Sequence, residues 1–324
     1  MTANELCERW TTREGQRLAN EVLARLSSRR TLQGLGLGEI DGRLDLRGLT
    51  VPQPTRVSST REGRLRVDTL TGLVEFDGAE LRDLDLRHSQ LDSIRFFRCS
   101  VVNCRFDGAR CRDWRLWAVD VTDSSFVGAD LRSSMLGAWH NGRGGTFRNV
   151  DFSRADFRDA VSSTATFVDC DFSYARLVKI DFDSSGFIRC RFAGELREVT
   201  FWDHGFKTGK PDPNPMEDVD FSNATLRWVE FRRLDLDRVR FPNDADHIVV
   251  RNFPCVLRSI LGALHGNESP AARHLRVFCE HDLKWIGEHQ QVGVFQRLDL
   301  GDDEDDRDFA VEHIRRAERE CESK

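Results

Sequence analysis

A large apolar side chain recurs every five residues from about residue 74 to residue 243. The first run of these central positions comprises Phe76, Leu81, Leu86, Leu91, Phe96, Val101, Phe106, Cys111, Leu116, Val121, Phe126, Leu131 and Leu136. After a slip of one residue, the run continues through Phe147, Phe152, Phe157, Ser162, Phe167, Phe172, Leu177, Phe182, Phe187 and Phe192. A period of five fits neither the 3.6-residue period of a helix nor the 2-residue period of a strand. The spacing therefore predicts a repeat architecture.

Two other positions of the repeat have a preferred composition. A small or slim residue stands two positions before many central residues, as in Ala79, Cys99 and Ala129. The position between them is often aspartate, as in Asp85 and Asp130. Small residues leave room for a core. We expect the aspartates to turn corners of the chain by hydrogen bonding to nearby backbone.

Segments such as Ala79-Glu80-Leu81-Arg82-Asp83 and Ala129-Asp130-Leu131-Arg132-Ser133 resemble the unit of the pentapeptide-repeat family. In that family a small residue is followed by Asp or Asn, then Leu or Phe, then two variable residues. The resemblance covers a little over half of the chain. It implies an all-β solenoid, a right-handed quadrilateral β-helix in which four pentapeptides make one square coil of twenty residues.

Residues twenty apart should then lie directly above one another. Allowing for single-residue slips, one such series contains five phenylalanines: Phe106, Phe126, Phe147, Phe167 and Phe187. We expect these rings to form one stacked, buried column on a single wall of the coil, each burying roughly 150–250 Å².

The sequence as a whole divides into four segments. Residues 1–33 are expected to form a helical cap, because Leu18, Val22 and Leu26 make an apolar stripe after the capping residue Thr12. Residues 34–73 read as a degenerate first turn with a loop at 52–62, and residues 74–243 as the β-helix. Residues 244–324 are expected to be helical, with one helix after Pro254, a second over 271–286 and a last one entered through an acidic run.

The charge of the chain is concentrated near its end. The net charge is −6, and residues 302–308 hold six acids and one base, which leaves about −1 for the remainder. The repeats interleave Asp with Arg and carry no broad negative field. No apolar run approaches a membrane span of roughly 18 residues, and no signal-peptide pattern is present, so we expect a cytoplasmic protein. Cysteines of the repeats, such as Cys104 and Cys170, are expected to be small buried hydrophobes in a reducing compartment.

No catalytic constellation emerges, since the aspartates follow the corner spacing and no histidine is paired in sequence with an evident nucleophile. The group Cys279, His281 and His289 matches no zinc spacing. No phosphate-binding loop pattern occurs. We therefore expect no enzymatic activity, no metal and no cofactor.

Two interruptions of the repeat are candidate partner-binding loops, because loops on rigid scaffolds often carry recognition. The first is the glycine-rich segment 137–145, and the second is the proline-rich segment 207–215. The alternative is that both are tolerated surface insertions. The candidate contact residues are Trp139, His140, Asn141, Arg143, Lys207, Lys210, Asp212 and Asn214.

The resemblance also implies a function. Qnr-type quinolone-resistance members of the family bind DNA gyrase or topoisomerase IV and protect it, partly through a DNA-like rod shape. Because the rod here is nearly neutral, we expect specificity to come from the loops. A homodimer through the C-terminal region, involving Phe278, Trp285 and Phe295, is expected, with no direct binding to nucleic acid or membrane. The alternative function is an interaction scaffold with a partner other than a topoisomerase.

Overall fold

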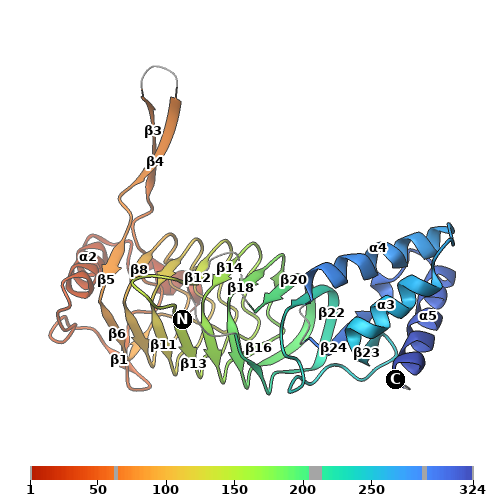
Figure 1. Ribbon diagram of the computed structural model, residues 1–324. Coiled ribbons are helices and arrows are strands. Elements are labelled where there is room, and N and C mark those ends of the chain that lie inside the picture. Colours follow the sequence, from red (N-terminus) through yellow and green to blue (C-terminus); the bar gives the residue numbers. More distant parts are fainter. Residues whose placement is uncertain (1, 62–64, 204–213, 287–289, 323–324) are drawn as a thin grey trace. The chain divides into compact units, whose positions relative to one another are not determined.

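The computed structural model describes residues 2–61, 65–203, 214–286 and 290–322 (Figure 1). They belong to two compact units, Met1–Arg176 and Leu177–Lys324. Both units contain coils of parallel strands, so the predicted β-helix solenoid is confirmed. Of the helices that the described residues form, none is long and apolar enough to cross a membrane.

Two faces of each coil in the first unit are short strands in parallel sheets. One sheet has the order β5 (Glu75–Asp77), β8 (Arg95–Phe97), β10 (Arg115–Trp117), β12 (Met135–Ala138) and β14 (Val161–Ser163). The other has the order β6 (Glu80–Arg82), β9 (Ser100–Val102), β11 (Asp120–Thr122), β13 (Thr146–Arg148) and β15 (Thr166–Val168). Isolated bridges, such as Asp85 opposite Arg105 and Arg110 opposite Asp130, form the other two faces, and a short strand β16 (Asp171–Ser173) lies near the end of the unit.

A residue in the left-handed region turns the chain at nearly every corner. Within the repeats, the first such non-glycine residues follow the five-residue spacing: Asp83, His88, Ser93, Arg98 and Asn103, with φ between 54° and 62°. This conformation costs roughly 1–2 kcal/mol per non-glycine residue. The predicted aspartates do bond the local backbone, since Asp130 Oδ1 accepts from Arg132 N at 3.3 Å. The turn itself, however, lies three residues after the aspartate, at Ser133.

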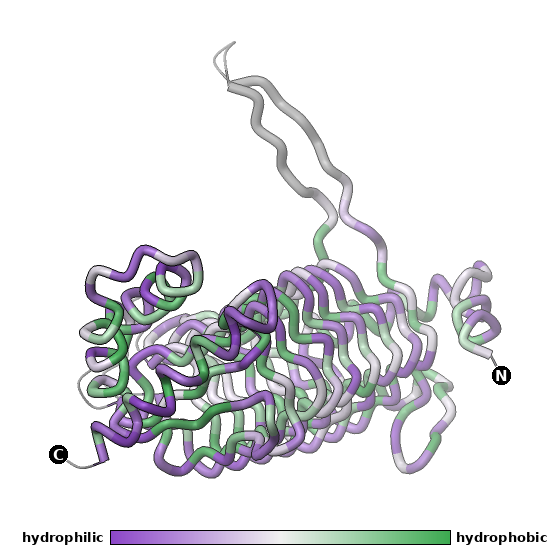
Figure 2. The backbone as a smooth tube through the Cα atoms, turned by 90° about the vertical axis from the view of Figure 1, so that its right-hand side faces the viewer, coloured by the Kyte–Doolittle hydropathy of each residue, from purple (hydrophilic) through white to green (hydrophobic). Residues whose placement is uncertain are grey.

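The side chains at the central positions fill the interior of the first unit. Phe96, Phe106, Phe147, Phe157 and Phe167 are all fully buried. Figure 2 shows hydrophobic residues recurring along each coil of the chain. The apolar period therefore identifies the core residues correctly.

The predicted single column of phenylalanines is wrong. Phe106 stacks on Phe126 with ring centroids 4.6 Å apart, and Phe126 stacks on Phe152 at 5.3 Å. Phe147 lies opposite Val121 and stacks on Phe167 at 4.9 Å. Phe126 and Phe147 thus lie on different faces of the coil. Phe187 belongs to the second unit.

The cause of this error is the length of the glycine-rich interruption. Val121 pairs with Phe147, 26 residues later, where an uninterrupted coil has twenty. Leu136 and Phe147 occupy consecutive faces, so six extra residues stand between them. Eleven residues also fit two repeats plus one residue, and the sequence pattern alone could not separate a six-residue insertion from a one-residue slip.

Two helices and a hairpin precede the regular coils. Helices α1 (Ala3–Glu8) and α2 (Arg13–Ser27) replace the single expected helix, and Thr12 caps α2 by accepting from Gly15 N at 3.0 Å. Arg9 and Trp10, between the helices, bond the first coil: Arg9 binds Asp45, and the Trp10 indole donates to the Arg47 carbonyl at 2.8 Å.

The expected loop at 52–62 is instead largely a strand of a hairpin. Strands β3 (Thr55–Arg61) and β4 (Leu65–Thr71) pair antiparallel. The first coil includes the antiparallel pair β1 (Glu39–Ile40) and β2 (Arg43–Asp45), and β2 pairs in parallel with β7 (Leu84–Asp85). The run of Pro, Ser, Thr and Arg resembles irregular chain because it lacks the apolar period of the repeat.

The second unit begins with further coils. Its strands are β17 (Leu177–Val178), β18 (Asp181–Asp183), β19 (Gly186–Ile188), β20 (Arg191–Trp202), β21 (Met216–Glu217) and β22 (Asp220–Arg232). Strand β20 pairs in parallel with β18 and β22, which places Phe182, Phe201 and Phe231 in register. The ring of Phe201 stacks on Phe182 at 5.1 Å and on Phe231 at 5.2 Å.

Three helices and a strand pair complete the second unit. The predicted helices are present as α3 (Phe253–Ala263), α4 (Pro270–Trp285) and α5 (Glu304–Glu322). The sequence did not predict the antiparallel strands β23 (His247–Arg251) and β24 (Val292–Gln296), or the 3-10 turn Arg297–Asp299 after them. Phe295 of β24 is fully buried among these helices. It therefore cannot be the dimer contact that we expected of it.

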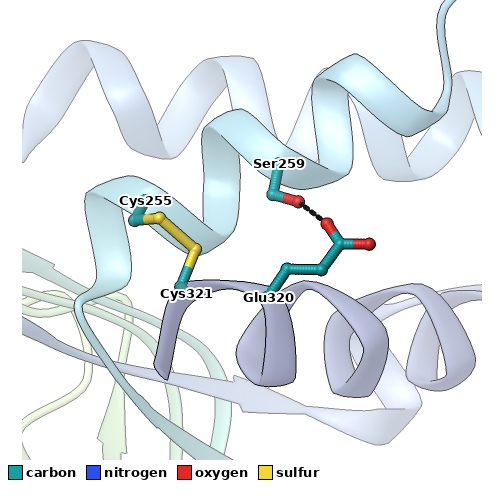
Figure 3. The surroundings of a disulfide bond; sticks show 4 residues. All are labelled: Cys255, Ser259, Glu320 and Cys321. Atoms are coloured by element: carbon teal, nitrogen blue, oxygen red, sulfur yellow. Dashed lines mark hydrogen bonds between the residues drawn. A yellow bond between two sulfur atoms is a disulfide. The ribbon is translucent and has the colours of Figure 1, made fainter. Parts of the chain in front are cut away.

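A disulfide joins Cys255 on α3 to Cys321 on α5 (Figure 3). Beside it, Ser259 donates to Glu320 with an oxygen–oxygen distance of 2.6 Å. The disulfide was not expected from the sequence, because these two cysteines are 66 positions apart and follow no spacing pattern. The repeat cysteines are buried free thiols, as predicted, and burial raises the pKa of Cys104 to about 12.

The corrected register can be tested with double-mutant cycles. We expect Phe126→Leu and Phe152→Leu to couple by roughly 0.5–1.5 kcal/mol in urea unfolding, because the two rings stack. Phe126→Leu and Phe147→Leu are the control pair and should add independently. Coupling of the control pair alone would contradict the register.

The disulfide predicts a redox-dependent stability. Reduction should lower the free energy of unfolding by about 2–4 kcal/mol. The unfolded chain gains conformational entropy when the cross-link between Cys255 and Cys321 is removed. Melting with and without dithiothreitol measures the effect, and the double variant Cys255→Ser, Cys321→Ser should not respond to the reductant. Thiol titration of denatured protein should find seven thiols. Nine would show that the bond is absent.

Candidate partner-binding surface

The first predicted loop is a tight turn. His140 and Arg143 exchange backbone hydrogen bonds of 2.9 and 3.2 Å, and the two residues between them have positive φ, 49° at Asn141 and 86° at Gly142. Two central residues of positive φ define the type I′ turn, which favours Asn-Gly. The turn therefore presents its side chains in a fixed arrangement.

Glycines let the inserted segment lie against the neighbouring coil. A Cβ atom at Gly144 would stand 1.8 Å from the carbonyl oxygen of Thr164, and one at Gly137 would stand 2.4 Å from the Cβ of Ala165. No side chain can occupy either position without moving backbone. The two ends of the inserted segment thus lie against the packed wall of the first unit, whereas Asn141, Gly142 and Arg143 between them are exposed.

Partly exposed aromatic rings lie next to this turn. Phe97 and Trp117 lie on neighbouring strands β8 and β10, opposite each other, and their rings stack at 4.5 Å with an interplanar angle of 2°. The His140 ring meets Phe97 edge-on at 6.0 Å. Trp139 directly precedes His140 in the sequence and is 37% exposed. We call Phe97, Trp117, Trp139 and His140 the aromatic surface.

Charged groups beside the aromatic surface are paired with one another. Arg143 binds Asp120 at 2.9 Å and donates to the Ala118 carbonyl at 2.9 Å. Arg98 donates to Asp77 at 2.6 Å, and these hydrogen bonds lower the pKa of Asp77. Arg143 is therefore held against the coil, although half of its side chain stays accessible.

The same pairing extends along the first unit. Asp130 binds both Arg132 and Arg112, and Asp156 binds Arg158. Burial alone would raise the pKa of Asp130, but the hydrogen bonds from Arg132 and Arg112 outweigh it and lower the pKa to about 2. These carboxylates remain ionised near neutral pH while their field is largely cancelled by the partner guanidinium groups.

The second predicted loop gives a different result. Lys207, Lys210 and Asp212 lie outside the described residues. Asn214 was expected to contact a partner, but it is buried, with 5% of its surface exposed. Its backbone N–H donates to Asp203 at 2.7 Å and its side chain donates to the Trp202 carbonyl at 2.9 Å. Asn214 therefore has a structural role, because its side-chain amide donates a hydrogen bond to a buried backbone carbonyl group.

Phe97 and Trp117 were not predicted from the sequence, although a signal was present. Each directly follows a central residue, at a position that the repeat usually gives to a polar side chain, and the two stand twenty residues apart. An aromatic residue recurring at an outward position after one coil predicts a stacked pair on the surface. Among the described residues, no group of His, Cys, Asp and Glu is arranged to hold a metal ion.

Comparison with known proteins agrees with the coil geometry. Residues 146–183 match the family model of pentapeptide repeats, with eight copies. No curated protein matches the chain. Similar solved structures include HetL, a pentapeptide repeat protein involved in heterocyst differentiation regulation from the cyanobacterium Nostoc sp. strain PCC 7120. It is 14% identical, the match covers 69% of this chain and 92% of HetL, and the TM-score is 0.29.

Two further similar structures are of QnrB1, a plasmid-mediated fluoroquinolone resistance protein. The full-length protein is 14% identical, with 49% of this chain and 93% of QnrB1 covered and a TM-score of 0.19. A trypsin-treated variant is 19% identical, with 48% and 82% covered and a TM-score of 0.23. Residues 146–183 are thus matched as pentapeptide repeats, and the four-sided coils of the first unit have the twenty-residue spacing that such repeats give.

The packed state of the turn can be tested by two glycine substitutions. Gly144→Ala should lower the melting temperature strongly, because its Cβ would meet the Thr164 carbonyl. Gly142→Ala meets no atom within 4 Å and should cost only about 1 kcal/mol of strain from its positive φ. Equal melting temperatures for the two variants would mean that the segment is a loose loop.

Proposed function

We propose that this protein is a non-enzymatic interaction protein that binds and modulates a type II DNA topoisomerase, such as DNA gyrase, and protects it from topoisomerase poisons. The observation that supports the proposal is the aromatic surface. Phe97, Trp117 and Trp139 stand at outward positions of a rigid coil beside a held arginine, Arg143. Trp and Arg are the residues that most often anchor protein interfaces.

Rigidity contributes to this binding surface. Phe97 and Trp117 are fixed by paired strands, and His140 by a turn with two backbone hydrogen bonds. Aromatic rings already held in one arrangement lose little conformational freedom when a partner covers them. A partner would gain apolar contact over stacked rings at small entropic cost.

The choice of a topoisomerase draws on the family. QnrB1 is a fluoroquinolone resistance protein, and members of that type protect type II topoisomerases. A DNA-like field is a poor basis for the contact here, because Asp130 and Asp156 are already neutralised by arginines. Under this proposal, recognition uses the shape of the coils and the aromatic surface in place of a phosphate-like field.

The alternative is a scaffold for a different protein partner. The composition of the aromatic surface favours a protein partner in general, since it offers stacked rings beside a guanidinium group whose own carboxylate partner is already in place. The same surface would then carry the contact. A binding screen that starts from the intact protein distinguishes the two, because only the topoisomerase proposal requires gyrase itself.

A topoisomerase partner places the protein in the cytoplasm. Disulfides are rare in that compartment, so the state of Cys255 and Cys321 in the cell bears directly on this part of the proposal. We also propose a homodimer through the C-terminal region. With Phe295 buried, the exposed side of α4, including Val277, is the apolar surface available for it. Sedimentation at micromolar concentration tests the dimer.

The central test measures binding to purified DNA gyrase and protection of its supercoiling activity from a fluoroquinolone. We expect the double variant Trp117→Ala, Trp139→Ala to bind at least tenfold more weakly, since each ring is an interface anchor. Tyr174→Ala is the matched control, because Tyr174 is an aromatic residue of the same unit with 64% of its surface exposed. It should bind and protect like the native protein.

The outcomes separate the proposals. Loss of binding in the double variant with a preserved melting temperature supports the aromatic surface. Equal loss in Tyr174→Ala would mean that the effect is not specific to that surface. If the native protein does not bind gyrase, the topoisomerase proposal is wrong and the scaffold function remains.

A further inference from the structure

A cavity of about 530 Å³ lies within the second unit, between helix α4 and strands β22 and β24. Its volume is within the range of small-molecule sites, roughly 300–1,000 Å³. Helix α4 lines it with residues three or four positions apart, which share one helix face: His274, Phe278, Asp282 and Trp285. None of these residues belongs to the aromatic surface.

Aromatic rings form part of the cavity walls. Phe231 of β22, together with Phe278 and Trp285 of α4, contributes rings to its lining. The Trp285 ring is held in place by Arg232, whose guanidinium lies 4.6 Å from its centroid, and by the edge of Trp202 at 5.5 Å. Fixed rings of this kind favour a flat, apolar ligand.

One carboxylate in the cavity is left without a partner among the described residues. No hydrogen bond or ion pair joins the Asp282 carboxylate to any of them. Burial raises the pKa of Asp282 to about 7; repulsion from Glu230 raises it further, and Arg232 opposes this effect. A carboxylate that lines a cavity without a counterion is costly unless something cationic or hydrogen-donating meets it.

The neighbouring charged groups are already engaged. Glu230 accepts from Arg232 Nε at 2.6 Å and lies 3.3 Å from His281 Nε2. At the other end of the cavity, Asp299 is bound by Arg227 at 2.8 Å. Of the three acids in the described lining, Asp282 is therefore the one left to pair with a cationic ligand, and Arg273 is a charged lining residue of opposite sign.

A second polar group points to a ligand independently. Gln296 of β24 lines the cavity and is 5% exposed. Its Oε1 accepts from Leu298 N at 2.6 Å, but its Nε2 has no acceptor among the described residues. A buried amide donor normally has a partner. A ligand with an acceptor atom would supply one.

We propose that this cavity binds a small amphipathic cation: an aromatic ring system that carries a protonated amine, which pairs with Asp282, and an acceptor atom, which meets Gln296. The rings of Phe278 and Trp285 contact the ring system of the ligand. The inference rests on the cavity alone and is independent of any topoisomerase partner.

The test uses two probes that differ in one group. The amine 5-hydroxytryptamine has the ring, the acceptor and the cation, whereas 5-hydroxyindole-3-acetate has the same hydroxylated ring with a carboxylate. Calorimetric titration of the full-length protein at pH 8 should detect the amine at least tenfold more tightly than the acid, because only the amine pairs with Asp282. Equal affinities, or no binding of the amine at millimolar concentration, would overturn the proposal.

Two variants on α4 locate the binding. Asp282→Asn should weaken amine binding about tenfold by removing the charge while keeping the shape. Glu280→Gln removes an exposed acid of the same helix outside the cavity and should leave binding unchanged. An Asp282→Asn variant that binds the amine as tightly as the native protein would show that the cavity does not recognise the cation.

A pH series gives a readout that needs no variant. The cation pairs with ionised Asp282, so amine affinity should fall roughly tenfold from pH 8 to pH 6 as the carboxylate binds a proton. A protonated His281, beside Glu230, would also repel the cation. In the Asp282→Asn variant, any remaining pH dependence of amine binding would report the contribution of His281. A native affinity that is independent of pH would contradict the role of Asp282.

Discussion

The repeat region depends on backbone hydrogen bonds between coils, which hold a chain that turns a corner every five residues. The corner residues include Arg98, Arg154 and Tyr174, none of which favours the left-handed conformation that it adopts. Each costs roughly 1–2 kcal/mol. The cost is offset because the corners bring the next central side chain into the core, and because the N–H groups of corner residues donate to carbonyls of the neighbouring coil, as from Ser93 to Arg112 and from Arg98 to Trp117.

This dependence explains what the sequence could predict. The five-residue period reflects burial, so it identified the core side chains and the solenoid without any knowledge of pairing. Register is a different quantity, since it depends on which N–H meets which carbonyl. Between Leu136 and Phe147 the period survives a six-residue insertion almost unchanged, and the faces were therefore assigned wrongly from that point.

The candidate sites show the same limit. Trp139 and Arg143 were identified because they interrupt the repeat. Phe97 and Trp117, which stack on each other, lie inside regular units and were not predicted. Asn214 was assigned to the surface because it stands among prolines, whereas its amide is used to satisfy buried backbone. The disulfide and the cavity each bring together residues that are far apart in the sequence. No local sequence pattern predicts contacts of this kind.

The paired coils around the first hairpin have a consequence for engineering. Leu44 lies opposite Leu84 and Thr50 opposite Gln90, forty positions later instead of twenty, because the insertion that contains the hairpin Thr55–Thr71 fits into one corner without disturbing the faces on either side. At this corner, the geometry of the coil face after the insertion therefore does not depend on the length of the inserted segment. A foreign peptide exchanged for β3 and β4 would be displayed on a support whose hydrogen bonds resume at the next face, which makes this corner an attachment point for a grafted peptide.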